Sequence, residues 1–292
     1  MPTLRWKWLP IALLTFFVAL SSASPQKKSS IKPITKPPTK IQSLFFAIKK
    51  GNLDKVKSLL KEGVNPNARD DEGTTPLCSA ILTFNRQAKK QIVEALLQNK
   101  ADPNLGTQTK HRGDMSFPSG MTALMLASLI VDYDSAELLL KSGAKVDAVN
   151  ADGSTAIMYT SFYPSNDPKA KTSVDLASLY INNGADVNHK DKSGITPLMS
   201  AINGYSVEMV QFLLDKGADI TIKNKRGQTP LLFAIHNISL LISATESYKA
   251  PALKIVKALI AKGAGQSEEE KKQALKKARF LDLKEVEALL NK

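Results

Sequence analysis

A short phrase that recurs at a fixed spacing constrains this chain more than any other feature. It begins with threonine and continues with apolar residues: TPLCSA from Thr75, TALMLA from Thr122, TAIMYT from Thr155, TPLMSA from Thr196 and TPLLFA from Thr229. Successive starts lie 47, 33, 41 and 33 residues apart, so the unit is 33 residues long with insertions of 14 and 8. Degenerate copies begin at Gln42 and Gln273. A period of this length predicts one elongated stack of about seven units, the last one truncated.

Two further phrases give each unit its internal structure. Val56, Leu59 and Leu60 have the i, i+3, i+4 spacing that lines one face of a helix, and Gly63 just after them supplies a left-handed helix end. Threonine followed by proline matches the start of another helix, because the missing proline N–H costs nothing there. Asp or Asn followed three residues later by Gly, as in DDEG from Asp70, predicts a type I turn. Each unit should therefore hold two helices, joined to the next unit by a turn that we call a finger.

Together these phrases resemble the ankyrin repeat, and the resemblance covers residues 41–292. It implies an all-α solenoid of stacked helix-turn-helix units whose role is protein recognition. The family's phrase usually has histidine as its fourth residue, whereas every copy here is apolar: Phe45, Cys78, Met125, Met158, Met199 and Leu232. We therefore expect Cys78 to be a small buried apolar side chain rather than a redox site. Lys100 replaces a cap glycine, so we expect that helix end to be less regular.

Insertions mark the places where this chain departs from a plain repeat. We expect loops between the two helices of a unit at residues 84–90, 163–172 and 236–252. Residues 105–120 lengthen one finger, and their polar, glycine-rich sequence indicates an accessible segment.

The first residues of the chain have the pattern of a secretory signal peptide. Residues 1–23 contain Arg5 and Lys7, an uncharged run from Leu9 to Leu20, and small residues up to Ala23, after which we expect cleavage. Twelve residues of helix reach about 18 Å, short of the ~30 Å bilayer core, so a retained anchor is the weaker alternative. Export before a domain with one cysteine favours the periplasm or secretion from a bacterium.

Residues 24–40 carry five lysines and no acidic residue, and a segment so poor in apolar residues cannot bury a core. We expect a Lys/Pro-rich disordered spacer, with weak electrostatic contact to an anionic membrane surface as the alternative.

Composition argues against several classes of function. The 40 basic and 27 acidic residues give a net charge of +13, but the basic residues lack interleaved aromatics and export removes the chain from nucleic acid. One cysteine excludes disulfides within the chain and a Cys-rich zinc module. The three histidines fall in three different units, so the sequence gives no sign of a catalytic triad, in which a nucleophile, a base and a residue that orients the base lie together. We expect a monomer that is not an enzyme and has no catalytic residue, metal or cofactor.

Partners should bind to the fingers and the solvent side of the first helices. Together these form one concave groove along the stack, and the residues two and three places past each phrase should face it. They form an apolar patch beside a polar residue: Leu82, Leu129, Ile130, Phe162, Tyr163 and Asn203. The alternative is that some of them belong to the core or are covered by the inserted loops.

The fingertips change in charge along the stack. Asp71 and Glu72 make the first tip acidic, and later tips are basic through Lys190, Lys192, Lys225 and Arg226. This polarity would fix the direction of a protein or peptide bound lengthwise. The sequence thus predicts a non-enzymatic scaffold or adaptor in the cell envelope. An inhibitor or immunity protein that neutralises a toxin or enzyme in that compartment is the alternative.

Overall fold

The computed structural model describes residues 37–83, 85–108, 118–160, 172–241 and 249–291. Within these ranges the chain forms seven pairs of helices and no strand. The pairs are α2 (Lys40–Lys49) with α3 (Leu53–Lys61), α4 (Pro76–Ile81) with α5 (Arg86–Gln98), α6 (Ala123–Leu129) with α7 (Tyr133–Lys141), η1 (Ala156–Tyr159) with α8 (Ser173–Asn182), α9 (Pro197–Asn203) with α10 (Val207–Asp215), α11 (Pro230–Leu241) with α12 (Lys249–Ala261), and α13 (Glu268–Phe280) with α14 (Lys284–Leu290). The predicted all-helical solenoid is confirmed.

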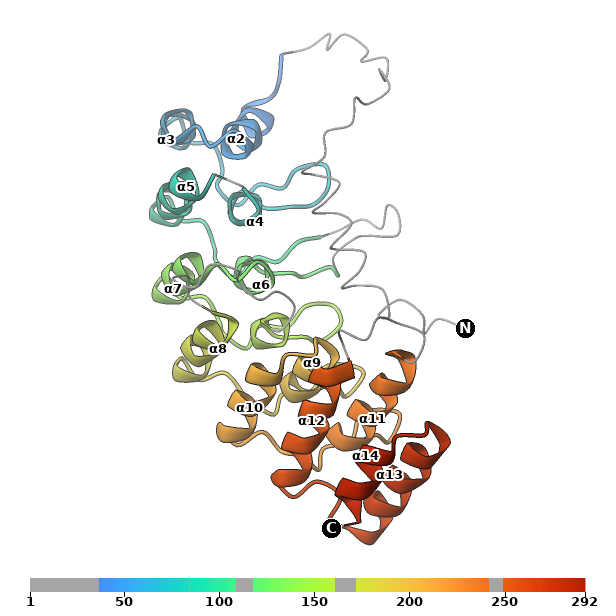
Figure 1. Cartoon of the computed structure of the whole chain (residues 1–292). Helices are drawn as coiled ribbons and strands as arrows, with labels where there is room; N and C mark the ends of the chain where they lie inside the picture. The colour runs from blue at the N-terminus through green and yellow to red at the C-terminus, as the bar shows by residue number, and fades with distance from the viewer. Residues whose placement is uncertain (1–36, 84, 109–117, 161–171, 242–248, 292) are drawn as a thin grey trace.

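The pairs stack in chain order, from α2 and α3 at one end to α13 and α14 at the other (Figure 1). First helices contact first helices, and second helices contact second helices, so the stack has two columns. One continuous apolar core runs through it from Leu44 to Leu290. Each pair alone would leave its apolar face in water, and stacking removes that face from solvent. No helix in the described ranges has the length and apolar character of a membrane span.

Threonine side chains start several of the first helices as predicted. The hydroxyl of Thr75 accepts the backbone N–H of Cys78, and Pro76 occupies the first turn of α4. In the first unit, Thr39 and Gln42 form a reciprocal capping box, so α2 begins at Lys40. This residue was predicted to end the spacer. The predicted signal peptide, residues 1–23, and residues 24–36 lie outside the described part of the chain.

The apolar fourth residue of the phrase is buried in every copy, as predicted. Exposed fractions run from 0% to 4% for Phe45, Cys78, Met125, Met158, Met199 and Leu232. Cys78 is a free thiol, and burial raises the pKa of its thiol group. A raised thiol pKa lowers the thiolate population, which fits a packing role for this side chain.

The fourth unit contradicts the expectation of a first helix in every unit. Its phrase forms a single 3-10 turn, η1, in which the N–H of Met158 bonds to the carbonyl of Thr155 at 3.2 Å. The Thr155 hydroxyl is buried and makes no hydrogen bond in the described part of the chain. Tyr159 accepts a hydrogen bond from Asn150 at 2.7 Å, which ties the turn to the preceding finger. The bond from residue i+3 to residue i replaces the threonine cap seen in other units.

Two of the predicted insertion loops are largely helical. Residues 86–90 form the first turns of α5, and the described residues of 236–252 belong to α11 and α12. Asn85 caps α5 by accepting the N–H of Ala88 at 3.1 Å. Four extra residues add about one helical turn, so Ala88 and Ile92 stay on the buried face. In the remaining predicted loop, residues 163–172, Thr172 caps α8, and residues 163–171 lie outside the described part.

The extended α5 brings a charged residue into the interface with the next unit. Lys89 Nζ lies 3.1 Å from Asp132 Oδ2, with side chains 10% and 17% exposed. Asp132 also caps α7 by accepting the N–H of Ser135. Removing either partner would leave a nearly buried charge unpaired, so both members of this pair are needed where α5 meets the start of α7.

The expectation of an irregular helix end at Lys100 is wrong. Lys100 takes a left-handed φ of 68°, as Gly143 does at 87°. The N–H of Lys100 bonds to Leu97 O at 3.0 Å, which matches the Gly143 bond to Leu140. The side-chain amide of Asn67 in the preceding unit donates to the Lys100 carbonyl at 3.0 Å. Contact with that unit therefore holds a non-glycine residue in a conformation that glycine adopts more cheaply.

Replacing Lys100 with glycine should stabilise the protein, because left-handed backbone costs a side-chain-bearing residue about 1–2 kcal/mol. The greater entropy of glycine in the unfolded chain offsets part of this, leaving a gain of about 0.5–1 kcal/mol. Urea denaturation followed by circular dichroism measures the shift in midpoint.

The matched control for Lys100→Gly is Gly217→Lys. Gly217 has φ 85° and open space around its Cβ position, so the backbone conformation dominates the cost. This variant should lose a similar amount of stability. Equal midpoints for both variants and the parent would contradict the assignment of strain to Lys100.

Candidate functional site

Four of the described fingers are each held by one Asp or Asn side chain at the turn. Asp70 Oδ1 accepts the N–H groups of Glu72 and Thr74 at 3.1 and 2.8 Å. The same pair of bonds is made in later fingers by Asn150, Asp191 and Asn224. A glycine at positive φ completes each turn, for example Gly73 at 79°. The fingers are therefore preformed loops with few unsatisfied backbone groups.

Neighbouring fingers are bonded to one another through their backbones. Gln108 N donates to Gly73 O at 2.9 Å, and equivalent bonds join Ala151 to Ser119, Lys192 to Asp152 and Lys225 to Ser193. Arg69 Nη1 donates to the carbonyls of Gly73 and Gly106, at 2.9 and 2.7 Å, and bridges the first two fingers. This ladder presents the fingertips as one continuous edge. Residues 109–117 of the long finger lie outside the described part.

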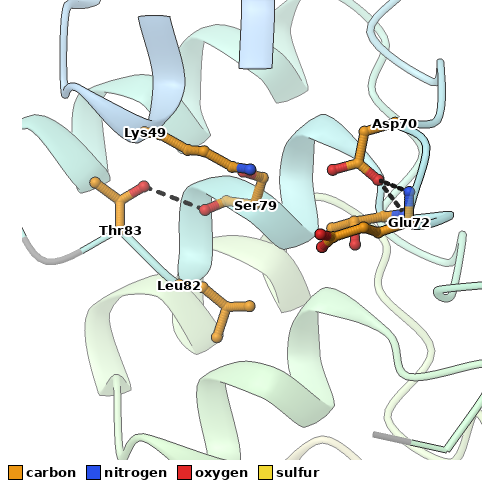
Figure 2. Close-up of a pocket in the computed structure, with 7 residues that line it drawn as sticks. Lys49, Asp70, Glu72, Ser79, Leu82 and Thr83 are labelled. Carbon is orange, nitrogen blue, oxygen red and sulfur yellow. Dashed lines mark hydrogen bonds between the residues drawn. The ribbon is translucent and has the colours of Figure 1, made fainter. Parts of the chain in front are cut away.

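A cleft opens between the first two units, where the first finger meets α2 and α4. Its volume is about 230 Å³, and we call it the N-terminal cleft: Lys49, Asp70, Glu72, Thr74, Ser79, Leu82 and Thr83. Figure 2 shows Lys49 reaching in from α2 and the carboxylates of Asp70 and Glu72 at the finger side, with Leu82 and Thr83 at the other side. One cation, two carboxylates and an exposed leucine can bind the backbone and side chains of an extended peptide.

The predicted apolar patch is only partly open. Leu82 is 39% exposed and lines the N-terminal cleft. Leu129 is 4% exposed and belongs to the core, so its placement in the open groove is wrong. The last turn of α6 directs Leu129 between neighbouring units. Ile130 is half-buried and packs on the core, and Asn203 is half-buried. Phe162 and Tyr163 lie outside the described residues.

The fingertip charges lie on the surface as the sequence pattern requires. All six of the predicted side chains are exposed: Asp71, Glu72, Lys190, Lys192, Lys225 and Arg226. Beside the basic tip at Lys190, His189 is held by a 2.8 Å contact from Nε2 to the Gly153 carbonyl of the preceding finger. The first described fingertip is thus acidic, and the fingertips of the fifth and sixth units are basic.

A second cleft, which the sequence predictions did not include, lies between α11 and α13. This C-terminal cleft has a volume of about 580 Å³ and is lined by His236, Gln273, Lys276, Lys277, Phe280 and Leu281. Alignment of QALKKARF with TPLCSAIL places Phe280 at the position of Leu82 and Lys277 at that of Ser79. The same groove positions could therefore have been found from the repeat register.

The described residues contain no group of three or more His, Cys, Asp and Glu side chains placed to hold a metal ion. The side chains of both clefts offer charged, polar and apolar contacts to a ligand.

Comparison with protein families matches this chain to the model "Ankyrin repeats (3 copies)" over residues 21–107, 44–150 and 169–266. Among solved structures, the ankyrin repeat domain of Bcl-3, a member of the IkappaB protein family, is similar with a TM-score of 0.57 and 26% identity. That match covers 76% of this chain and 86% of the Bcl-3 chain.

Similar sequences come from viruses and animals. An ankyrin repeat protein of Acanthamoeba polyphaga mimivirus, L371, is 30% identical over 155 residues, which are 53% of this chain and 18% of the relative. FPV031 of fowlpox virus is 31% identical over 172 residues, which are 56% of this chain and 45% of the relative. Human neurogenic locus notch homolog protein 1 is 28% identical over 159 residues, 54% of this chain and 5% of the relative. The chain thus spans less than half the length of each of these relatives.

The finger carboxylate of Asp191 gives a pH-dependent prediction. Burial raises the pKa of this carboxyl above 3.8; Asp152 adds to the shift, while backbone hydrogen bonds and His189 oppose it. The ionised form therefore costs stability above the folded pKa, and protonation removes that cost as the pH falls. Asp191→Asn copies the neutral Asn150 and Asn224, so it should raise the melting temperature at pH 7 and lose this advantage below pH 3.8.

Asp219→Asn is the control with the opposite sign. Hydrogen bonds from the side chain and backbone of Thr221 lower the pKa of the Asp219 carboxyl. That variant should be less stable at pH 7, and the loss should fade in acid. A melting temperature for Asp191→Asn that stays at or below the parent value at pH 7 would contradict the interpretation.

Proposed function

Because the chain belongs to the ankyrin repeat family, we propose that it is a non-enzymatic scaffold or adaptor that binds a protein or peptide along its fingers and first helices. Ankyrin repeats are generally protein–protein interaction modules. The observation that carries the proposal is the N-terminal cleft, which is lined by an exposed leucine, a lysine and two finger carboxylates. Such a site combines an apolar anchor with charges that select a partner.

The charge pattern supports a ligand bound lengthwise. Asp71 and Glu72 would attract a basic segment of the partner, and Lys190, Lys192 and Lys225 an acidic one. Opposite charges at the two ends would disfavour the reversed orientation. Leu82 supplies the apolar contact beside the acidic end. Phe162 and Tyr163, outside the described residues, stay candidates for this surface from the sequence alone.

The cellular setting stays a prediction of the sequence. Residues 1–23 would direct export and be removed after Ala23, and residues 24–40 would separate the stack from its point of entry into the envelope. Viral and animal relatives lend no support to a bacterial origin.

Intact-mass measurement of the protein recovered from the exported compartment tests this setting. We expect the chain to begin at Ser24, because the small residues before it match a signal-peptidase site. A chain that retains Met1 would instead indicate an uncleaved anchor.

Reversing the charge of the first fingertip should weaken partner binding by about tenfold, which corresponds to ~1.4 kcal/mol of binding free energy. The variant is Asp71→Lys with Glu72→Lys, two exposed positions whose side chains form no hydrogen bond within the described part of the chain. Residues 24–292 are immobilised and exposed to proteins of the exported compartment. Mass spectrometry then identifies the proteins that are retained. The affinity of the most enriched one is then measured for the parent and the variant.

The matched control makes the same change of charge on the column of second helices. Asp54→Lys with Glu208→Lys alters exposed residues of α3 and α10, away from the fingers, and should leave the affinity within about twofold. Equal weakening by both variants would contradict binding at the fingers. Inhibition of a captured toxin or enzyme would establish the inhibitor function instead of the scaffold.

A further inference from the structure

The C-terminal cleft has the same position in the repeat as the N-terminal cleft but different chemistry. His236 is the residue of α11 that corresponds to Lys49 of α2, and Phe280 corresponds to Leu82. In the N-terminal cleft the finger supplies Asp70 and Glu72. Between α12 and α13 the chain has a short link, residues 262–267, so no finger carboxylate reaches the C-terminal cleft.

Two lysines line this cleft without an anionic partner in the described part of the chain. Neither Lys276 nor Lys277 forms an ion pair or side-chain hydrogen bond there. Burial lowers the pKa of Lys277, as expected for an ammonium group that has lost part of its hydration. Partly dehydrated cations gain more than exposed ones from an anionic ligand.

Several carboxylates of α13 and α14 are engaged by other groups, among them Glu269, which accepts a 3.0 Å hydrogen bond from the cleft residue Gln273. Glu270 accepts the Gly265 N–H at 2.8 Å and the hydroxyl of Thr229. Glu285 pairs with Lys257, and Glu287 lies 3.3 Å from Arg279 Nε. These acidic groups thus hold α13 and α14 in place. They do not neutralise the lysines of the cleft, whose positive charges can bind an anionic ligand.

The cleft also has an apolar wall. Phe280 is 89% exposed, the largest exposed fraction among the large apolar side chains of the described residues. Leu281 beside it is half-buried. An exposed aromatic ring beside a cleft can anchor a partner, because burying it on binding removes its apolar surface from water.

We propose that the C-terminal cleft binds an acidic peptide segment of a protein partner in which an Asp or Glu lies beside a large apolar residue. Carboxylates of the segment pair with Lys276 and Lys277, and its apolar side chain covers Phe280. The volume of about 580 Å³ suits a few residues of an extended chain. The inference rests on the proposed function and adds the chemistry of the ligand segment at this end of the stack.

A defined peptide tests the proposal without knowledge of the natural partner. The probe is a fluorescein-labelled octapeptide in which glutamates flank a leucine and a phenylalanine, and fluorescence anisotropy reports its binding to residues 24–292. We expect saturable binding that weakens with salt. A peptide with lysine for every glutamate, and one with glycine for both apolar residues, should each bind at least tenfold more weakly. No binding of the acidic peptide would overturn the proposal.

Variants locate the binding on the protein. Lys276→Glu and Phe280→Ala should each weaken the acidic peptide about tenfold, whereas Lys272→Glu makes the same charge change at an exposed position of α13 outside the cleft and should stay within twofold. Circular dichroism confirms that each variant is folded. Equal weakening by Lys276→Glu and Lys272→Glu would show general attraction to a basic surface and overturn the cleft assignment.

A further experiment tests whether the cleft binds an anionic membrane rather than a peptide. Vesicles of phosphatidylcholine with phosphatidylglycerol should not compete with the peptide for binding. Vesicles that bind through Lys276 and Phe280 when the peptide does not would overturn the proposal. Failure of the peptide experiments would leave the effect of Asp71→Lys with Glu72→Lys on the captured partner intact. Loss of that effect alone would instead count against the proposed function.

Discussion

The apolar faces of the helix pairs leave water only where one pair covers the next, and the rest of the structure depends on this contact. One continuous core links Leu44 in the first pair to Leu290 in the last. Bonds between units hold their spacing: Asn67 and Asn104 each bridge to the helix end of the following unit, and the finger backbones form a ladder. Burial supplies the stability, and these directional bonds set the geometry of the binding surface.

The same contact explains where binding groups are available. In the third unit α6 packs against neighbours on both sides, and its residues Leu126 and Leu129 are buried. In the first and seventh units the corresponding positions have a described neighbour on one side, and Phe46 and Phe280 are 64% and 89% exposed. One cleft lies between the first and second units and the other between the sixth and seventh. They differ in charge because a finger contributes acidic groups to the first and lysines of α13 line the second.

Several sequence predictions describe the fold well because they concern local rules repeated many times. The Thr75 cap, the glycine at Gly217 and the burial of Cys78 follow from helix ends and from apolar spacing, and all are confirmed. The predictions that failed concern packing between units. Residues 86–90 form helix because Ala88 finds a buried place, and Lys100 keeps a regular helix end because Asn67 holds its carbonyl. Neither contact is visible in the local sequence.

The sequence by itself determined the period, the helix pairs, the turn residues and the order of charges along the fingertips, since each follows from residues close together in the chain. The tertiary structure decided which groove positions remain open. Leu82 and Leu129 occupy equivalent positions and have the same chemistry, but one is 39% exposed and the other 4%. Exposure depends on how completely the neighbouring unit covers a side chain, and that is a property of packing rather than of pattern.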